Sequence, residues 1–353
     1  MELGAGSVRR LTYVRILGSA PGRNREGIRT VQLNEGYVDS SGTRIHYVEA
    51  GSGPLVMLVH GFPESWYSWR HQIDHLASRG WRCVAIDHRG YGLSDNPPEV
   101  ESYTAMHLAG DVVAVAGALQ PGPFSLIGHD WGASVAWNTA LFRPDLVNAV
   151  AGLSVPFGAR PPVPPIGILR RRVGEGFYQV YFQEPGVAEA ELEADVHRSL
   201  AVLFYAVSGE AGNKHGISNL TKLGDKSLLA SLPEPPETLM PWLTSTDLDR
   251  FAEGFERNGF SGPLNFYRNM DRNWQLTAPW AGKRIEPPAL FVAGSLDPVV
   301  NFPGAQANIE SMTGRFDALE TVEMIPGGGH WIQQEKPEEV NELLESFLNR
   351  HGA

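Results

Sequence analysis

The sequence predicts an α/β fold: a doubly wound, mostly parallel central sheet flanked by helices and interrupted by an inserted helical segment. Short, continuous apolar runs alternate with segments of helical periodicity, which is typical of parallel strands buried on both faces. The alternation stops near Ser154 and resumes at Ala289, and the residues between them show helical segments without a clear strand. With 353 residues, 42% of them hydrophobic, the chain can bury a full core and is not a disordered protein.

The first half of the chain contains most of the predicted sheet. Residues 1–30, rich in Gly, Arg and Ser, are expected to form an extension that is loosely ordered, or ordered only by lying on the main body. Alternating runs at 31–39 and 43–50 flank Asp39-Ser40-Ser41-Gly42, which indicates a hairpin turn. The expected parallel strands are 55–59, 83–86, 124–127 and 147–153, and helical periodicity separates them at about 65–79, 104–119 and 133–143.

The second half begins with a proline-dense stretch from Ser154 to Gly167, which predicts a stiff exit from the core. Residues from about 170 to 282 predict helices and loops. Core strands are expected again at 289–293 and near 321–324, followed by a closing helix at about 336–350. The predicted domains are an extension (1–30), a first core part (31–155), a helical cap (156–284) and a second core part (285–353).

Composition excludes several classes of protein. The net charge of −11 argues against a nucleic-acid partner, because no basic surplus is available to neutralise phosphates. No apolar run approaches the ~20 residues of a membrane-spanning helix. The only cysteine, Cys83, lies in an apolar run and is expected to be a buried strand residue, which fits a reducing compartment. We therefore expect a soluble, cytoplasmic protein, and the sequence leaves open whether it is a monomer or a homodimer.

Asp130 is the strongest candidate for a catalytic residue because of its position relative to the sheet. It closely follows the apolar run ending at Ile127 and precedes a predicted helix, which is the strand–turn–helix context of a nucleophile elbow. Gly128 and Gly132 bracket the turn, where close backbones leave no room for a β-carbon. A carboxylate there is already anionic at neutral pH and needs no base to activate it. Without this context, Asp130 would be an ordinary turn residue.

A nucleophile elbow is followed along the chain by an acid and then by a histidine. Asp297 lies in the loop after the strand predicted at 289–293, and His330 follows three glycines after the last predicted strand. These positions fit an orienting acid and a general base. The backbone N–H groups of Phe62 and Trp131 are the expected hydrogen-bond donors to an oxyanion.

Six stretches of the sequence form a characteristic set: HGFPESWYSWR, DHRGYGLSD, GHDWGAS, FYQVYFQEPGVAEAELE, GPLNFYRNMDRNW and GGGHWIQQEKP. On these stretches the chain, from about residue 36 to its end, resembles the epoxide hydrolase branch of the α/β-hydrolase superfamily, and most of all the hydrolase domain of soluble epoxide hydrolases. The resemblance implies the α/β-hydrolase fold with an inserted helical cap. It also implies an enzyme of detoxification that converts an apolar epoxide, such as a lipid or arene-type one, to a vicinal diol without a metal or organic cofactor.

The same resemblance implies roles for individual residues. Asp130 is the nucleophile that forms a covalent ester, His330 is the general base and Asp297 is its orienting acid. Tyr178 and Tyr267 match the two cap tyrosines that hold the epoxide oxygen. The residues expected to line the substrate pocket are Phe62, Pro63, Trp131, Met270 and Trp331.

Chemistry alone selects the tyrosines less clearly. Aromatic residues in a cap are more often packing residues than catalytic ones, and Tyr181 is a rival to Tyr178. Two histidines that flank the expected site, His60 and His129, are expected to be structural.

Two other functions remain as alternatives. A haloalkane dehalogenase of this fold also uses an Asp nucleophile beside a Trp, but it usually offers a halide-binding Asn where Phe62 stands. A halide also leaves as an anion, so paired tyrosines would have no role in its departure. A non-catalytic small-molecule receptor could retain the fold after losing one mechanistic group. Here all five groups are present, which favours the enzyme.

Overall fold

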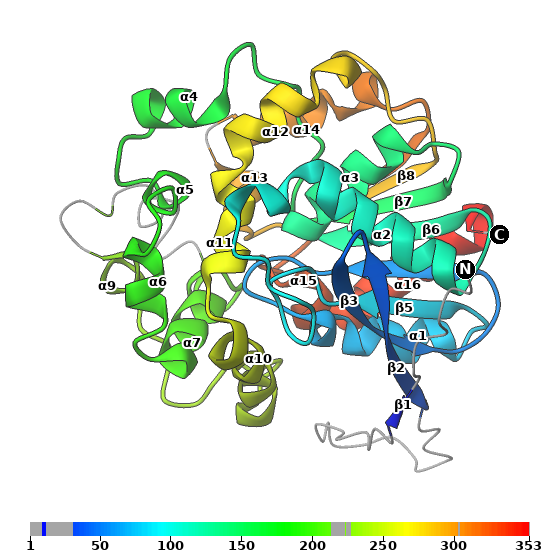
Figure 1. Cartoon of the computed structure of the whole chain (residues 1–353), viewed down its shortest axis with the longest axis horizontal. Coiled ribbons are helices and arrows are strands. Elements are labelled where there is room, and N and C mark those ends of the chain that lie inside the picture. Colours follow the sequence, from blue (N-terminus) through cyan, green and yellow to red (C-terminus); the bar gives the residue numbers. More distant parts are fainter. Residues whose placement is uncertain (1–8, 12–30, 213–222, 224–226, 303, 353) are drawn as a thin grey trace.

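In the computed structural model, the described residues are 9–11, 31–212, 223, 227–302 and 304–352. Nine strands of this described part form one sheet in the order β1-β2-β3-β5-β4-β6-β7-β8-β9. The strands β1 to β3 and β5 pair antiparallel, and the pairings from β5 to β9 are parallel. The predicted α/β class and mostly parallel sheet are therefore confirmed (Figure 1).

The antiparallel edge begins with the predicted hairpin. Strands β2 (Leu33–Ser40) and β3 (Thr43–Ala50) are joined by Ser41 and Gly42, which both have positive φ, 54° and 87°. Positive φ at both residues of a two-residue loop is the geometry that matches the twist of a hairpin. Strand β1 (Arg9–Leu11) pairs with β2, so one piece of the predicted extension lies on the main body; the rest of that extension is outside the described residues.

The parallel strands are buried on both faces. Along β4 (Leu55–Val59), Met57 contributes to one hydrophobic cluster and Leu58 to the other, on the opposite face of the sheet. This explains why the strands appear in the sequence as continuous apolar runs. The other strands of this part are β5 (Arg82–Ile86), β6 (Phe124–His129), β7 (Val147–Leu153), β8 (Ala289–Gly294) and β9 (Leu319–Ile325). As predicted, Cys83 is a buried residue of β5.

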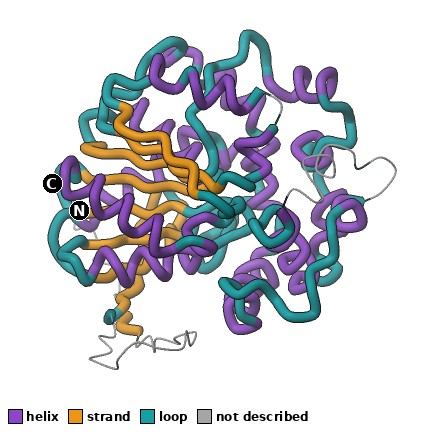
Figure 2. Tube along the Cα trace, turned by 180° about the vertical axis from the view of Figure 1, so that it is seen from behind, coloured by secondary structure: helices purple, strands orange, loops and turns teal. Residues whose placement is uncertain are grey.

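Helices pack against both faces of the sheet (Figure 2). The helix α1 (Arg70–Ala77) packs on α16 (Pro337–His351), and their apolar residues share one cluster. On the other face, α2 (Ala105–Leu119) packs on α3 (Trp131–Phe142). Shorter elements precede or follow these helices: η1 (Trp66–Trp69), η2 (Val100–Tyr103), α13 (Pro298–Asn301), α14 (Ala305–Glu310), η5 (Met312–Arg315) and α15 (Ile332–Glu335).

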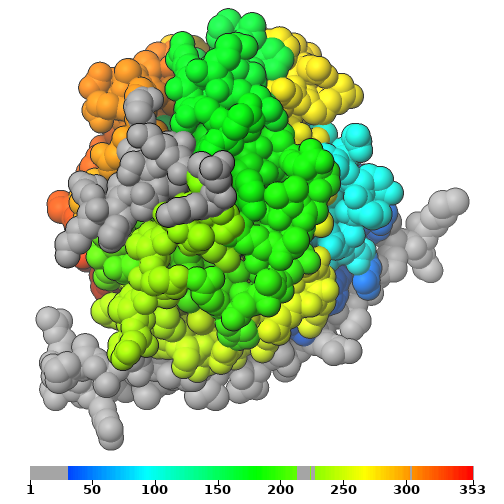
Figure 3. Space-filling model, turned by 90° about the vertical axis from the view of Figure 1, so that its left-hand side faces the viewer, coloured from blue at the N-terminus to red at the C-terminus, as the bar shows by residue number. Residues whose placement is uncertain are grey.

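Between β7 and β8 the described residues contain helices and no strand, as the sequence predicts. We call this helical segment the cap. It covers one side of the molecule (Figure 3). Its helices are α4 (Pro165–Arg172), α5 (Tyr178–Tyr181), α6 (Val187–Leu192), α7 (Val196–Ala206), α9 (Leu228–Ser231), α10 (Ser245–Asn258), α11 (Ser261–Arg268), α12 (Met270–Leu276) and η4 (Ala278–Trp280). The boundaries proposed for it, 156 and 284, stay a prediction.

Polar contacts hold the cap on the core. The hydroxyl of Tyr67, in η1, donates a 2.8 Å hydrogen bond to Asp247 Oδ1 at the start of α10, and Arg70 Nε lies 3.6 Å from the same oxygen. Asp247 is also the N3 residue of a capping box with Thr244, so its carboxylate both caps the start of the helix and anchors it to the core.

In the described residues, no helix is long and apolar enough to cross a membrane.

Candidate active site

Asp130 lies at the tip of a strained turn between β6 and α3. Its φ of 52° and ψ of −118° place it in a region that residues with a side chain rarely occupy. Such a conformation costs roughly 1–3 kcal/mol and persists only where the surroundings enforce it, which occurs most often at functional sites. The turn places the carboxylate at the carboxyl end of the parallel strands, where open α/β sheets bind ligands.

The two glycines that bracket this turn are required by space. A β-carbon on Gly128 would lie 2.0 Å from the carbonyl oxygen of Gly132. A β-carbon on Gly132 would lie 1.9 Å from the carbonyl oxygen of Val59, in the neighbouring strand β4. The sharp turn therefore depends on backbones that approach more closely than any side chain allows.

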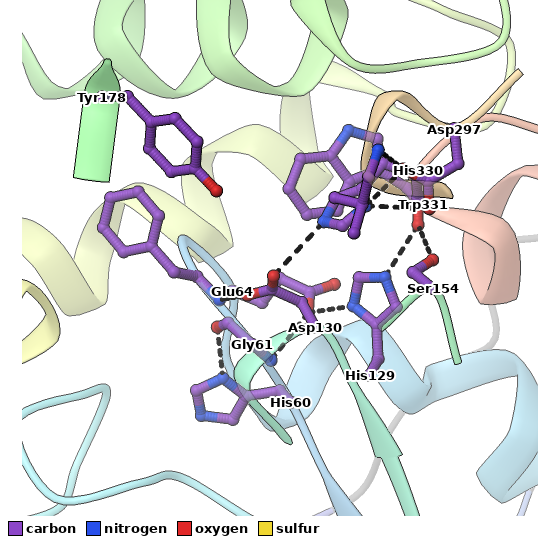
Figure 4. Close-up of polar contacts among 12 residues, drawn as sticks. His60, Gly61, Glu64, His129, Asp130, Ser154, Tyr178, Asp297, His330 and Trp331 are labelled. Carbon is purple, nitrogen blue, oxygen red and sulfur yellow. Dashed lines mark hydrogen bonds and ion pairs between the residues drawn. The ribbon is translucent and has the colours of Figure 1, made fainter. Parts of the chain in front are cut away.

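The two oxygens of the Asp130 carboxylate have different neighbours. Its Oδ1 accepts a 2.9 Å hydrogen bond from the backbone N–H of Phe62, in the loop after β4. Its Oδ2 lies 3.6 Å from Nε2 of His330 (Figure 4). In the described part of the chain the Trp131 N–H makes no hydrogen bond to this carboxylate, so its role as a second oxyanion donor stays a prediction.

His330 stands between two carboxylates. Its Nδ1 lies 3.0 and 3.1 Å from the two carboxylate oxygens of Asp297, which is fully buried in the loop after β8. An ionised carboxylate only accepts, so Nδ1 carries the proton and Nε2 is directed at Asp130. Burial by itself would lower the pKa of His330, but the charge of Asp297 and the contact with Asp130 raise it well above its ordinary value. The pKa of His330 therefore depends on whether Asp130 carries its charge.

Two cap tyrosines are close enough to interact electrostatically with Asp130. Tyr178, at the start of α5, directs its hydroxyl toward Asp130 and His330 (Figure 4). Tyr267, in α11, is buried and packs its ring edge-on against Phe62, with the ring centroids 5.7 Å apart. Burial first, and then the charge of Asp130, raise the pKa of both phenols, so both stay protonated at neutral pH.

The hydroxyl oxygens of Tyr178 and Tyr267 each accept a hydrogen bond from an N–H group of a neighbouring side chain. Such a group donates and cannot accept. Gln179 Nε2 donates to the Tyr178 oxygen at 2.9 Å, and the Trp131 side chain bonds the Tyr267 hydroxyl. The phenol protons are therefore left for another acceptor. Tyr181 differs, because its hydroxyl donates to Glu191 Oε2 at 2.7 Å. This contact argues against Tyr181 as the rival of Tyr178.

Aromatic side chains surround the Asp130 carboxylate. The ring of Phe62 packs against Phe182 and Tyr267, and the indole of Trp131 lies 5.0 Å from Tyr267 between ring centroids. Trp331 is buried beside His330 and donates from Nε1 to the carbonyl oxygen of Phe204 in α7.

The other two residues expected to line the pocket have less definite surroundings. Pro63 is buried directly after Phe62, and Met270, at the start of α12, is partly buried. The substrate-binding roles of all these pocket residues stay a prediction.

A buried charge pair beneath the site was not predicted from the sequence. Glu64 Oε2 accepts hydrogen bonds from the Gly61 N–H at 2.9 Å and from His129 Nδ1 at 2.7 Å. The other ring nitrogen of His129, Nε2, lies 2.7 Å from the carbonyl oxygen of His330. Burial by itself would raise the pKa of Glu64, but the charge of His129 and its hydrogen bonds lower it to about 2. Both ring nitrogens of His129 therefore face an oxygen, one of the Glu64 carboxylate and one of the His330 backbone.

This charge pair connects the nucleophile turn to the loop of His330. His129 directly precedes Asp130 and bonds the backbone of His330, whose carbonyl oxygen also accepts from Ser154 Oγ at 2.8 Å. The histidine expected to be structural therefore bears directly on the position of both catalytic candidates. The sequence carried no signal for Glu64, because a carboxylate in the loop after a strand is ordinary and its burial is seen only in the folded chain.

Comparisons with known proteins agree on one family. Residues 54–337 match the model of a family described as "alpha/beta hydrolase fold". Epoxide hydrolase A of Mycobacterium tuberculosis is 43% identical over 317 residues, which cover 89% of this chain and 97% of that protein. Epoxide hydrolase 1 of Siraitia grosvenorii is 40% identical over 90% of this chain and 99% of its own length. The crystal structure of epoxide hydrolase A from Mycobacterium thermoresistibile superposes with a TM-score of 0.83 at 44% identity, over 90% of this chain and 98% of that chain.

Proposed function

The chain belongs to the α/β-hydrolase fold family and, within it, to the epoxide hydrolases, and from this premise we propose that it converts an apolar epoxide and water to a vicinal diol through a covalent ester of Asp130. The observation that carries this mechanism is a carboxylate at the tip of the strained turn, opposite two phenols whose protons are free. A carboxylate attacks a saturated carbon without prior activation, and the phenols can donate to the oxygen that leaves.

The first step forms the ester. The oxygen of Asp130 that is not held by the Phe62 N–H attacks an epoxide carbon from the back, and the bond from that carbon to the ring oxygen breaks. Tyr178 and Tyr267 donate hydrogen bonds to the ring oxygen as negative charge develops on it, and one of the two phenols transfers its proton. The ring oxygen becomes a hydroxyl group and that phenol becomes a phenolate. Since the phenols are on the cap and the carboxylate is on the core, nucleophile, carbon and leaving oxygen are held in line between the two.

The second step hydrolyses the ester. Esterification removes the negative charge of Asp130, which is one of the two groups that raise the pKa of His330. The pKa of His330 then falls, so His330 gives its Nε2 proton to the phenolate and Nε2 becomes free to take a proton from water, while Asp297 stabilises the imidazolium that results. The hydroxide attacks the ester carbonyl of Asp130, and the Phe62 N–H stabilises the oxyanion on the oxygen it already holds. Collapse of this intermediate breaks the ester C–O bond, and the diol oxygen takes the proton of the newly added hydroxyl group as it leaves. The carboxylate of Asp130 is restored beside the imidazolium of His330.

A single-turnover reaction in ¹⁸O-water tests this route. We expect label in the Asp130 carboxylate and none in the diol after one turnover with excess enzyme, because water attacks the ester carbonyl and not the epoxide. Peptide mass analysis locates the label, and styrene oxide is a suitable apolar probe. Label found only in the diol would show direct attack by water and would rule out the ester.

Replacement of the cap tyrosines tests their role as donors. We expect Tyr178→Phe and Tyr267→Phe each to slow ester formation by about 10- to 100-fold, and the double variant by about 10³-fold, because each variant removes one donor to a developing oxyanion. Rapid-quench measurement of the ester gives these rates. Since the pKa of each phenol is raised, ester formation by the unaltered enzyme should not fall through loss of these protons between pH 7 and about 10.

Tyr181→Phe is the matched control, since its hydroxyl is bonded to Glu191. It should change the rate of ester formation by no more than about 2-fold, the scale of a change that removes no catalytic contact. If it slowed ester formation as much as Tyr178→Phe, the assignment of the donor pair would be wrong.

The alternative functions make different predictions at the same site. A dehalogenase has no use for two phenol donors, because a halide leaves without a proton. Assay of halide release from a haloalkane against diol formation from an epoxide separates the two activities. A non-catalytic receptor would form neither product.

The physiological setting is part of the proposal. The aromatic surroundings of Asp130 favour an apolar epoxide as substrate. A cytoplasmic location is compatible with a single, buried cysteine.

A further inference from the structure

Glu335 joins the cap to the loop that carries His330. It is the last residue of α15 and is partly buried. Its Oε2 accepts from the backbone N–H of Gly209, in the cap, and of Gly329, both at 2.8 Å. Its Oε1 accepts from the N–H of Trp331 at 3.0 Å. One carboxylate therefore holds the N–H groups of the two residues on either side of His330 and a third N–H group in the cap.

The backbone of His330 itself is also bonded to the cap. Its N–H donates to the carbonyl oxygen of Val207 at 2.9 Å, just beyond the end of α7. Together with the bond from Trp331 Nε1 to Phe204, this makes three hydrogen bonds from the cap segment 204–209 to this loop or to Glu335. The N–H groups of residues 329, 330 and 331 thus point to the cap or to Glu335, and none pairs with a core strand.

The two segments meet without space between them. A β-carbon on Gly329 would lie 2.2 Å from the backbone nitrogen of Gly209. A β-carbon on Gly209 would lie 2.5 Å from the carbonyl oxygen of Gly327 and 2.8 Å from Glu335 Oε2. This close approach of the two backbones therefore requires glycine at both positions.

The opposite side of the His330 peptide is held by the core. Its carbonyl oxygen accepts from His129 Nε2 and Ser154 Oγ. The backbone around the proposed general base is therefore held between core and cap, and Glu335 supplies three of the contacts on the cap side. The cap also carries Tyr178 and Tyr267, so the same contacts relate the donors to the base.

Backbone groups alone hold the Glu335 carboxylate. Within the described residues, its hydrogen bonds go to the three N–H groups and to no basic side chain. Burial, with a contribution from Glu210, raises the pKa of Glu335 to about 7 although the three N–H donors lower it. A carboxyl group is thus kept in an unfavourable environment directly beside the loop of the base.

We propose that Glu335 is a positioning residue that ties the cap to the loop of His330 and controls the rate of ester hydrolysis more than the rate of ester formation. The inference rests on the proposed function, since it depends on the two steps. Ester formation needs Asp130 and the tyrosines, whereas ester hydrolysis needs His330 Nε2 in reach of a water and of the Asp130 carbonyl. Displacement of a catalytic group by about 1 Å costs on the order of 10²-fold in rate.

The test is Glu335→Gln in the full chain, with styrene oxide as the probe. In either orientation of the Gln amide, its nitrogen faces at least one of the three N–H donors and cannot accept from it, while the size of the side chain is kept. Rapid-quench mass analysis under single turnover gives the rate at which the ester forms and the rate at which it disappears. We expect ester formation to change by less than about 2-fold and ester hydrolysis to fall by about 10- to 100-fold. The ester should then accumulate at steady state.

Two further variants keep the experiment decisive. Glu335→Asp retains a carboxylate on a shorter side chain and should restore part of the hydrolysis rate; it carries the same test if the Gln variant does not fold. Glu339→Gln, at an exposed position in the first turn of α16, should leave both rates unchanged. Both rates come from the same folded molecules, so a loss of folded protein does not alter their ratio.

The outcomes separate this inference from the proposed function. An unchanged ratio of the two rates in Glu335→Gln, or an equal fall in both, overturns the positioning role while leaving the ester mechanism intact. Absence of any ester in the unaltered enzyme overturns the mechanism itself, and this inference with it. A selective fall in hydrolysis, partly reversed in Glu335→Asp, supports both.

Discussion

Replacement of Asp130 by Asn is expected to abolish diol formation, with a loss on the order of 10⁴-fold or more, the scale seen when the nucleophile of a covalent hydrolase is removed. An amide oxygen is a far weaker nucleophile than a carboxylate, and no ester can form. The fold should be retained, because Asn has nearly the size of Asp and tolerates a positive φ better than most residues. Diol formation from styrene oxide by chromatography and thermal unfolding of the same sample measure the two effects.

Two controls make this experiment conclusive. Slow deamidation of the introduced Asn would restore the carboxylate, so the intact mass of the variant must be checked before and after the assay. Asp249→Asn, on the surface of α10, removes a carboxylate of the same kind and should leave the rate unchanged. Full activity in an Asp130→Asn sample with no deamidated protein would refute the proposed nucleophile.

Replacement of His330 by Gln should stop the reaction halfway. Ester formation does not require proton transfer to His330, so one equivalent of epoxide should react with each enzyme molecule. Ester hydrolysis should then fall by about 10³-fold or more, the contribution expected of a general base. The measurement is the intact mass of the variant after mixing with excess styrene oxide, where the adduct should persist on the peptide that contains Asp130.

This outcome differs in kind from that of the Asp130 variant, which should form no adduct. His197→Gln is a suitable control, because His197 is exposed on α7 and pairs with Asp249 and Glu256 on the surface. It should turn over without accumulating the adduct. Rapid multiple turnover by His330→Gln would show that another group supplies the base.

The core elements could be predicted because their signals are local. The strand expected at 55–59 is β4 with the same bounds, and the hairpin turn, Ser41 and Gly42, lies within the predicted stretch from Asp39 to Gly42. The boundaries that differ do so by a few residues: α3 begins at Trp131 and not at residue 133, because the turn at Asp130 is tight enough for the helix to start directly after it. The predicted helical cap was also correct, since continuous helical segments without strand patterns are typical of such an insertion.

The three residues expected to act together could be predicted from the same local signals. Asp130, Asp297 and His330 each follow a strand of the parallel sheet, and the carboxyl ends of parallel strands lie on one edge. The structure brings these three side chains together, and it distinguishes Tyr178 from Tyr181 by their hydrogen bonds. The sequence could not distinguish Tyr178 from Tyr181 by residue type, because both belong to the same short helix.

What the sequence by itself determined is the succession of strands and helices and the tight turn that presents a carboxylate. These follow from periodicity and from glycine, and the class of reaction was implied by the resemblance to epoxide hydrolases. Only the tertiary structure decided which groups hold that chemistry in position. Three hydrogen bonds show this, since they join residues that lie 65, 201 and 126 positions apart: Glu64 with His129, His129 with His330, and Glu335 with Gly209. No pattern in the sequence identifies the hydrogen-bond partners of a buried carboxylate. Those partners, backbone N–H groups and imidazoles, are brought together only when the sheet and the cap fold.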